Sequence, residues 1–288
     1  MKHIFIVNPQ AGRNNHKITI DKIEAYCQNN NIDYKIHITT KPKEATKITK
    51  EYAFDKVIIF AVGGDGTLNE VLNGIIDTNN ILGVIPSGSG NDFYRVVKNY
   101  QNGDHVIDVG KFNDQYFINV LSIGIDAEVG ANVSIMKRLK VPSSQIYNFS
   151  IAYTFFKYKF KKISIQFDDI KINDKITLLS ICNGNYYGGG YNIAPFALLN
   201  DGLFDIYYAP KTSKLNIPSL LLKLMKSTHT NAKGIYHYQT NNISISSKDD
   251  MICNVDGEII KSKNLNIKII KNFIKIHVNN DLSDSLQI

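Results

Sequence analysis

The sequence predicts an α/β domain with a doubly wound parallel sheet over residues 1–121 and a β-sandwich domain over residues 122–279. Two observations support the first domain. Apolar strand-like runs alternate with helix-like segments, and polar, glycine-containing turns follow several of those runs. One observation supports the second domain, because short β-like segments separated by turn signals recur after residue 122.

The first domain is expected to place each strand before a helix. Strands are predicted near residues 2–7, 33–39, 56–62 and 82–86, and helices near 15–30, 42–52, 67–77 and 91–99. The apolar positions that follow Thr67 recur at helical spacing, so Thr67 is predicted to be the N-cap of the third helix.

From residue 104 onward the alternation gives way to hairpin signals. Residues 108–117 are predicted to form a hairpin with Asn113-Asp114 at its turn. Helices are then predicted near residues 126–137 and 145–160, and strands near 162–168, 176–183, 203–209, 233–247, 251–255, 264–270 and 273–277.

The sequence Gly63-Gly64-Asp65-Gly66-Thr67 joins the third predicted strand to the third predicted helix. Glycines permit a sharp turn and let backbone N–H groups approach an anion, and a helix N-terminus favours phosphate. Asp65 would repel bound phosphates unless a cation intervened, which indicates Mg²⁺. Glycine-rich turns also occur as plain architecture, but a merely structural turn needs no acid, and such turns recur in this chain.

Two further loops have a similar composition. Residues 86–92 (Pro-Ser-Gly-Ser-Gly-Asn-Asp) follow the fourth predicted strand, and residues 8–13 (Asn-Pro-Gln-Ala-Gly-Arg) follow the first. Ligands of parallel sheets bind outside the carboxyl ends of the strands. Three polar loops at that edge therefore predict a nucleotide cleft.

Composition excludes several other classes of protein. The 288 residues are 43% hydrophobic and 20% charged, which are globular values, with no apolar run of membrane-spanning length and no expected signal peptide. Neither GxxxxGK[ST] nor GxGxxG occurs, and the seven histidines form no zinc motif. The three cysteines are far apart, which is typical of reduced thiols in a cytosol.

The net charge of +7 is unevenly distributed. Basic residues gather in residues 137–162, where aromatic residues are interleaved with them, and in residues 206–248, which contain no acid. Basic and aromatic residues together suit an anionic membrane surface. The alternative is an aromatic core with lysines facing solvent. No nucleic-acid partner is expected.

Together, these motifs resemble the diacylglycerol kinase catalytic family, which includes bacterial lipid kinases and sphingosine and ceramide kinases. The resemblance rests on Asn8-Pro9 with Gly12, residues 63–67 with Asn69-Glu70, Pro86 with residues 88–92, and residues 123–127, 195–197, 201–205 and 256–258. It covers nearly the whole chain. It implies a first domain like those of NAD kinase and phosphofructokinase, to which residues 280–288 would return. It also implies ATP-dependent phosphorylation of a lipid hydroxyl, with diacylglycerol as the first candidate for the lipid. The expected location is the cytoplasm, with peripheral association at the inner face of the membrane.

The resemblance also implies roles for individual residues. Asp65, Asp92 and Asp126 would form an acidic network around Mg²⁺, Asp256 would be the general base, and Glu258 would help to place the nucleotide. Nucleotide contacts are implied for Asn8, Pro9, Gln10, Ala11, Gly12, Thr40, Gly64, Asp65, Gly66, Thr67, Leu68, Asn69, Glu70 and Ser89. A structural Mg²⁺ is implied at Asp201 with the carbonyls of Leu198 and Leu203.

Structural roles remain open for many of these residues. Asp92 and Asp126 are also typical helix caps, and Asp-Gly at 201–202 and 256–257 is typical of tight turns. Thr40 ends a strand, and residues 69–70 fit a solvated first turn. The alternative functions are a kinase of a soluble acceptor such as NAD, and a non-catalytic nucleotide or lipid sensor. The oligomeric state, including a homodimer, is left open.

Overall fold

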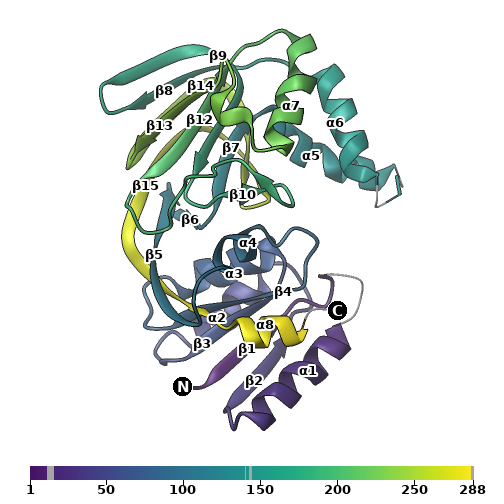
Figure 1. Cartoon of the computed structure of the whole chain (residues 1–288), viewed down its shortest axis with the longest axis vertical. Coiled ribbons are helices and arrows are strands. Elements are labelled where there is room, and N and C mark those ends of the chain that lie inside the picture. Colours follow the sequence, from purple (N-terminus) through teal and green to yellow (C-terminus); the bar gives the residue numbers. More distant parts are fainter. Residues whose placement is uncertain (12–15, 140, 143–144, 287–288) are drawn as a thin grey trace. The chain divides into compact units, whose positions relative to one another are not determined.

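The computed structural model describes residues 1–11, 16–139, 141–142 and 145–286 and divides the chain into two compact units (Figure 1). The first unit is Met1–Val109 with Ile270–Ile288, and the second is Gly110–Ile269. The sequence placed the division at residue 121 and the returning segment at residue 280. The difference arises because β5 (Gly103–Phe112) and β15 (Glu258–Val278) are long strands that each belong partly to both units, so no change of composition marks the division.

The first unit is a parallel sheet with helices between its strands. Its remaining elements are β1 (His3–Val7), α1 (His16–Asn29), β2 (Tyr34–Ile38), α2 (Glu44–Glu51), β3 (Ile58–Gly63), α3 (Asp65–Ile75), β4 (Ile81–Pro86), α4 (Asp92–Val97) and α8 (Asn280–Leu286). The strands pair in the order β2–β1–β3–β4, all parallel, and the end of β15 adds a further parallel strand beside β4. The predicted alternation of strand and helix is confirmed for these elements.

Both faces of this sheet are covered, so β1 and β3 are buried along their whole length and, apart from His3, are apolar rather than alternating. On one face Phe5 and Phe60 stack at 4.9 Å between ring centroids and pack, within one core cluster, with Ile23 of α1 and Leu282 of α8. Ile4, Ile6, Ile59 and Ala61 occupy the alternate positions and are equally buried, and α3 packs against β3 and β4.

The second unit contains the β-sandwich-like part of the chain. Its elements are β6 (Gln115–Phe117), β7 (Val120–Gly124), α5 (Ile125–Arg138), α6 (Ile146–Lys157), β8 (Lys162–Phe167), β9 (Ile170–Cys182), β10 (Tyr186–Tyr187), β11 (Tyr191–Asn192), β12 (Phe204–Pro210), η1 (Lys214–Asn216), α7 (Ile217–Met225), η2 (His229–Asn231), β13 (Tyr236–Thr240) and β14 (Asn242–Val255). Two long strands, β9 and β14, each pair with β8 through their first halves and with β7 through their second halves. A large apolar core that includes Phe117, Phe204 and Leu265 fills this arrangement.

Several strands of the second unit are longer than the sequence predicts. Residues 264–270 and 273–277 belong to the single strand β15, and residues 251–255 are the end of β14. The predicted strands were shorter because polar residues interrupt the apolar pattern within these long strands. At Asn272 the backbone takes a left-handed φ of 50°, and its amide donates to Asp108 Oδ1 at 2.7 Å, so the strand continues through a local irregularity. The sequence also missed α7, whose second residue is Pro218, a residue tolerated in a first helical turn.

Helices α5, α6 and α7 gather at one side of the second unit (Figure 1). Ile125 of α5, Ile217 of α7 and Tyr158 at the end of α6 form one small buried cluster. Within the described ranges, no helix combines the length and hydropathy needed to cross a bilayer.

Candidate active site

The turn between β3 and α3 is closely packed. A Cβ on Gly63 would lie 2.4 Å from Thr67 Oγ1, so a side chain there would displace the threonine. Thr67 in turn accepts a hydrogen bond of 3.1 Å from Asn8 Nδ2. The helix begins at Asp65 with Gly64 as its N-cap, so the prediction that Thr67 is the N-cap was wrong. Thr67 is instead a buried residue of the first turn that ties this loop to the one after β1.

The second glycine turn, between β4 and α4, packs directly against the first. A Cβ on Gly88 would lie 2.5 Å from Gly64 Cα, so the two backbones leave no room for a side chain. Ser87 N donates to Gly63 O at 3.0 Å, and Asn91 closes its own loop by accepting from Gly88 N and donating to Gly88 O. The two predicted phosphate loops therefore form one continuous backbone surface.

The loop after β1 completes this edge of the sheet. Asn8 N donates to Val62 O at 3.0 Å, and Asn8 Oδ1 accepts from Gln10 N at 3.0 Å. Pro9 and Ala11 lie in the same turn, whose closing bond runs from Ala11 N to Asn8 O. Gly12 lies outside the described residues. The three loops that the sequence singled out thus meet at the carboxyl ends of β1, β3 and β4.

Asp65 has a structural partner in this arrangement. Its Oδ1 accepts from the amides of Asp92 (2.8 Å) and Phe93 (3.4 Å), which are the first two of α4. Burial raises the pKa of Asp65, and those amide bonds oppose the shift. The expectation that a purely structural turn needs no acid was therefore wrong. The N-cap of α4 is Asn91 rather than Asp92, so the alternative interpretation of Asp92 as the cap is also incorrect.

The other residues of the first unit that were predicted to contact nucleotide differ in burial and in hydrogen bonding. Glu70 accepts from Lys43 N (2.8 Å) and Ala45 N (3.1 Å) at the start of α2, so it is not part of a solvated face. Asn69 is also buried. Thr40 donates from its amide and its hydroxyl to Glu44 in the turn before α2. Ser89 is exposed at the tip of its loop, and Leu68 is buried.

Asp256 lies in the second unit, at the hairpin between β14 and β15. Val255 pairs with Glu258, and the two residues between them have left-handed φ values of 46° and 92°, so the tight turn is confirmed. The carboxylate has a further role. Its Oδ2 accepts from Ile118 N at 2.7 Å, and its Oδ1 accepts from the amides of Asn119 (3.0 Å) and Val120 (2.9 Å). All three contacts come from backbone N–H groups, so both oxygens of the side chain act as acceptors. Glu258 itself is exposed.

Asp126 is the most unusual acid of the chain. Its carboxyl oxygens are buried in the first turn of α5, and burial raises its pKa to about 6, although the nearby Ser122 hydroxyl opposes the shift. Neither oxygen makes a hydrogen bond of normal geometry to any described residue. Because α5 begins at Ile125, Asp126 is not its N-cap. A buried acid of this kind fits a bound cation, which would supply the missing partner.

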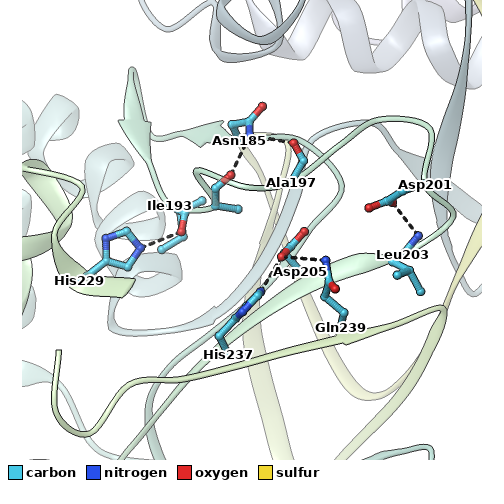
Figure 2. Close-up of polar contacts among 10 residues, drawn as sticks. Asn185, Ile193, Ala197, Asp201, Leu203, Asp205, His229, His237 and Gln239 are labelled. Carbon is cyan, nitrogen blue, oxygen red and sulfur yellow. Dashed lines mark hydrogen bonds and ion pairs between the residues drawn. The ribbon is translucent and has the colours of Figure 1, made fainter. Parts of the chain in front are cut away.

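The predicted second metal site is a turn. Asp201 Oδ1 accepts from Leu203 N at 2.9 Å, and Gly202 takes a φ of 75° (Figure 2). The chain before exposed Leu198 is fixed by Asn185, whose side chain donates to the carbonyls of Ala194 and Ala197 (Figure 2). No group of three or more His, Cys, Asp or Glu suited to a metal occurs in the described part of the chain. This loop offers only a carboxylate with carbonyls, a shell that Mg²⁺ or Ca²⁺ accepts.

Sequence reasoning missed one polar cluster beside this loop, in which exposed side chains of β13 meet the buried Asp205. His237 Nε2 lies 2.5 Å from Oδ1 of Asp205, and Gln239 Nε2 lies 3.4 Å from the same oxygen (Figure 2). Tyr207 stacks on the His237 ring at 4.8 Å. Asp205 and Tyr207 are two positions apart on β12, and His237 and Gln239 are two positions apart on the neighbouring β13. This spacing predicts that each pair shares one face of its strand, but it does not reveal which strands pair.

Comparisons with known proteins agree with the two parts of the chain. Residues 2–118 match the diacylglycerol kinase catalytic domain, and residues 119–278 match the YegS C-terminal NAD kinase beta sandwich-like domain. A diacylglycerol kinase of Bacillus subtilis (strain 168) is 30% identical over 270 residues, 88% of each chain. A diacylglycerol kinase of Staphylococcus saprophyticus is 28% identical, covering 97% of this chain and 96% of that relative. The crystal structure of a proposed diacylglycerol kinase from Bacillus anthracis str. Sterne aligns with a TM-score of 0.77 at 25% identity, covering 98% of this chain and 96% of that one.

Proposed function

The chain belongs to the diacylglycerol kinase family and is a lipid kinase, a phosphotransferase whose acceptor is an alcohol group, and we propose that its acceptor is diacylglycerol and its product phosphatidic acid. The observation that carries the proposal is the joining of three polar loops into one backbone surface at the carboxyl edge of the first unit's sheet. Both matched domains are present, and the relatives with diacylglycerol in their names are covered over nearly their full length.

The residues of the first unit suit ATP as the phosphate donor. An added Cβ on Gly66, at the start of α3, would meet nothing within 4 Å, so the helix N-terminus is open to an approaching phosphate. We assign phosphate contacts to Gly64, Gly66 and Thr67 with the Ser89 hydroxyl, and assign Asn8 to holding Thr67 in place. Bound Mg²⁺ would neutralise charge on the phosphoryl oxygens. Because the described residues contain no ready cluster of three such ligands, Asp65, Asp92 and Asp126 are proposed to act on it in part through bound water.

Asp256 is the proposed general base. The hydroxyl oxygen of the lipid attacks the γ-phosphorus as the bond to the β,γ-bridging oxygen breaks, ADP leaves, and the hydroxyl proton passes to Asp256. The three amides that bind Asp256 fix the position of its carboxylate.

Two other predictions from the sequence are part of this proposal. Asp201 with the carbonyls of Leu198 and Leu203 is proposed to hold a structural cation that stiffens its loop. Contact with the membrane surface is proposed because the acceptor is held in a bilayer. NAD is the second candidate acceptor, since the domain matched by residues 119–278 is named for its likeness to NAD kinase.

A transfer assay separates these acceptors. The purified protein is incubated with γ-labelled ATP and Mg²⁺, and with diacylglycerol in mixed micelles, with NAD, or with total membrane lipid, and the product is identified by mass. We expect label in phosphatidic acid and none in NADP. Labelling of a different lipid would overturn the choice of diacylglycerol, and labelling of NAD alone would overturn the proposed acceptor class.

A further inference from the structure

Helix α6 presents aromatic side chains to solvent. Phe149, Tyr153 and Phe156 follow one another at spacings of four and three residues, which places them on one face of the helix. Their side chains are 50%, 39% and 76% exposed. Such a stripe normally faces the core, and an exposed one of this size marks an interaction site.

A second face of α6 is polar and buried. Ser150 and Thr154 have no exposed surface, and their hydroxyls donate to the carbonyls of Ile146 and Ser150. Asn132 of α5 donates to Thr154 Oγ1 at 2.8 Å, so this hydroxyl face packs against α5. These hydroxyls face inward and the three rings face outward, while Phe155 packs against the small buried cluster of the unit. Core packing does not account for the three rings.

Neighbouring segments extend the exposed apolar surface. Leu139 follows α5, Leu215 lies in η1 and Leu222 lies in α7, with exposures of 66%, 85% and 56%. Lys214 Nζ donates to Phe156 O at 3.4 Å, which places η1 against the end of α6. The docking face is defined here by six side chains: Leu139, Phe149, Tyr153, Phe156, Leu215 and Leu222.

The charge around the docking face has one sign. Residues 129–167 contain seven Lys and Arg and no Asp or Glu, and residues 206–248 contain six Lys and no Asp or Glu. Arg138, Lys157, Lys159 and Lys223 are exposed within or next to α5, α6 and α7. None of these four takes part in the ion pairs found among the described residues. The exposed acids of this unit belong instead to the β5–β6 turn, the β8–β9 turn, β9, β14 and the start of β15.

We propose that the docking face seats the second unit on an anionic bilayer, with the rings of α6 at the level of the acyl boundary and the surrounding basic groups among the headgroups. This inference rests on the proposed lipid acceptor and names the surface that reaches it. A polar face turned inward, aromatic rings turned outward and basic side chains around them make up the composition of an interfacial helix. A second copy of this chain would bring the same positive charge against the face, so charge complementarity favours the membrane.

The absence of tryptophan makes a direct test simple. Phe156→Trp places a single reporter on the docking face, and Phe54→Trp, at a fully exposed position after α2, is the matched control. Each variant is mixed with vesicles of phosphatidylcholine alone or of phosphatidylcholine with phosphatidylglycerol in equal parts. We expect the emission of the Phe156→Trp variant to shift to the blue and to be quenched by brominated lipid only with anionic vesicles. The emission of the control should not change.

Vesicle sedimentation and kinase assays complete the test. Tyr153→Ser combined with Phe156→Ser should weaken binding to anionic vesicles by at least about tenfold, while Phe54→Ser leaves it unchanged. The double variant should keep its rate on a short-chain, water-dispersed diacylglycerol and lose rate on diacylglycerol in vesicles. Phe149→Ser alone is the second variant if the double variant proves unstable.

The outcomes are distinct. Unchanged sedimentation of the folded double variant, or no spectral response of the Phe156→Trp variant, would overturn the docking face. A wild-type dimer that the double variant converts to a monomer, with vesicle binding intact, would assign the face to a second copy and also overturn it. If the wild type phosphorylates diacylglycerol neither in dispersed form nor in vesicles, the proposed acceptor is wrong. The sedimentation result then still decides whether the docking face binds anionic vesicles.

Discussion

Replacing Asp256 with Asn should cost stability as well as turnover. The carboxylate receives three backbone N–H donors, one on Oδ2 and two on Oδ1. An asparagine side chain can keep two of them on its oxygen, but its NH₂ group then faces the amide of Ile118 where Oδ2 had accepted at 2.7 Å. A buried donor is left without an acceptor, and two donors oppose each other. The left-handed backbone of residue 256 is not the cause, because asparagine tolerates it.

The size of the loss follows from that one contact. A hydrogen bond to a charged group contributes about 1.5–3 kcal/mol, so the second unit should lose about 2 kcal/mol. For a unit of this size, that loss lowers Tm by about 4–8 °C. Circular dichroism against temperature measures it, and Asp249→Asn, at an exposed position of β14, is the control. Turnover is then measured on the folded variant well below its Tm, with ATP binding followed separately.

Two results would refute this reasoning. If Tm of Asp256→Asn stays within about 1 °C of the control, the three amide contacts do not stabilise the unit as argued. If the folded variant binds ATP and keeps the wild-type kcat, Asp256 is not the base, whatever happens to stability. A lower Tm with an unchanged kcat would leave the carboxylate a purely structural role.

The remaining predictions concern other sites. Gly88→Ala should raise the KM for ATP and lower Tm, because its Cβ would lie 2.5 Å from Gly64 Cα, whereas Gly66→Ala, with open space around its Cβ, should leave Tm unchanged. In Mg²⁺-free buffer, Asp126→Asn should be more stable than the wild type by about 3 kcal/mol at pH 7. The folded pKa of about 6 lies above the unfolded value, so the wild type gains stability from the protonated acid below about pH 4 and loses it as pH rises through 6. Thermal unfolding of both proteins from pH 4 to 8 checks this, and a pH-independent difference would contradict it. Glu70→Ala should cost about 1 kcal/mol by removing the acceptor for the first amides of α2. An unchanged KM for ATP in that variant would show that Glu70 serves the helix and not the nucleotide.

Much of the first unit could be predicted from local patterns, since β1, β3 and β4 are short, largely buried runs, each followed by a helical segment. The second unit was harder because its strands are long and irregular. Asn272 illustrates the difficulty: its left-handed backbone and its bond to Asp108 let β15 continue through residues that are typical of a turn. The outward direction of the α6 rings was equally hidden. Serine and threonine alternate with aromatic residues there, and the sequence does not say which set α5 covers.

The positions of the site residues were predictable, but their partners were not. Asp65 bonds to amides 27 and 28 positions away, and Asp256 bonds to amides 136 to 138 positions away. Periodicity reports the neighbours along a helix or a strand and carries no information about such distant contacts. The motifs therefore located the acids, while the fold alone shows that they bind backbone.

These contacts change how the acids should be understood. Asp65, Glu70 and Asp256 each accept two or more amide hydrogen bonds at the end of an element, so each is needed to hold its turn. Phosphoryl transfer depends mainly on positioning and on electrostatic stabilisation, and groups held by fixed dipoles need little reorganisation during the reaction. A structural role and a catalytic role are therefore not alternatives at these positions, because the amides that fix a carboxylate also prepare it for the reaction. Loss of activity after their removal cannot by itself assign chemistry, and only rates measured on variants shown to be folded can do so. Asp126 is the contrasting case, since its buried carboxyl oxygens have no hydrogen-bond partner of normal geometry among the described residues, and burial raises its pKa. If Mg²⁺ raises the stability of the wild type more than that of Asp126→Asn, the cation is the partner of the Asp126 carboxylate, as backbone amides are the partners of Asp65, Glu70 and Asp256.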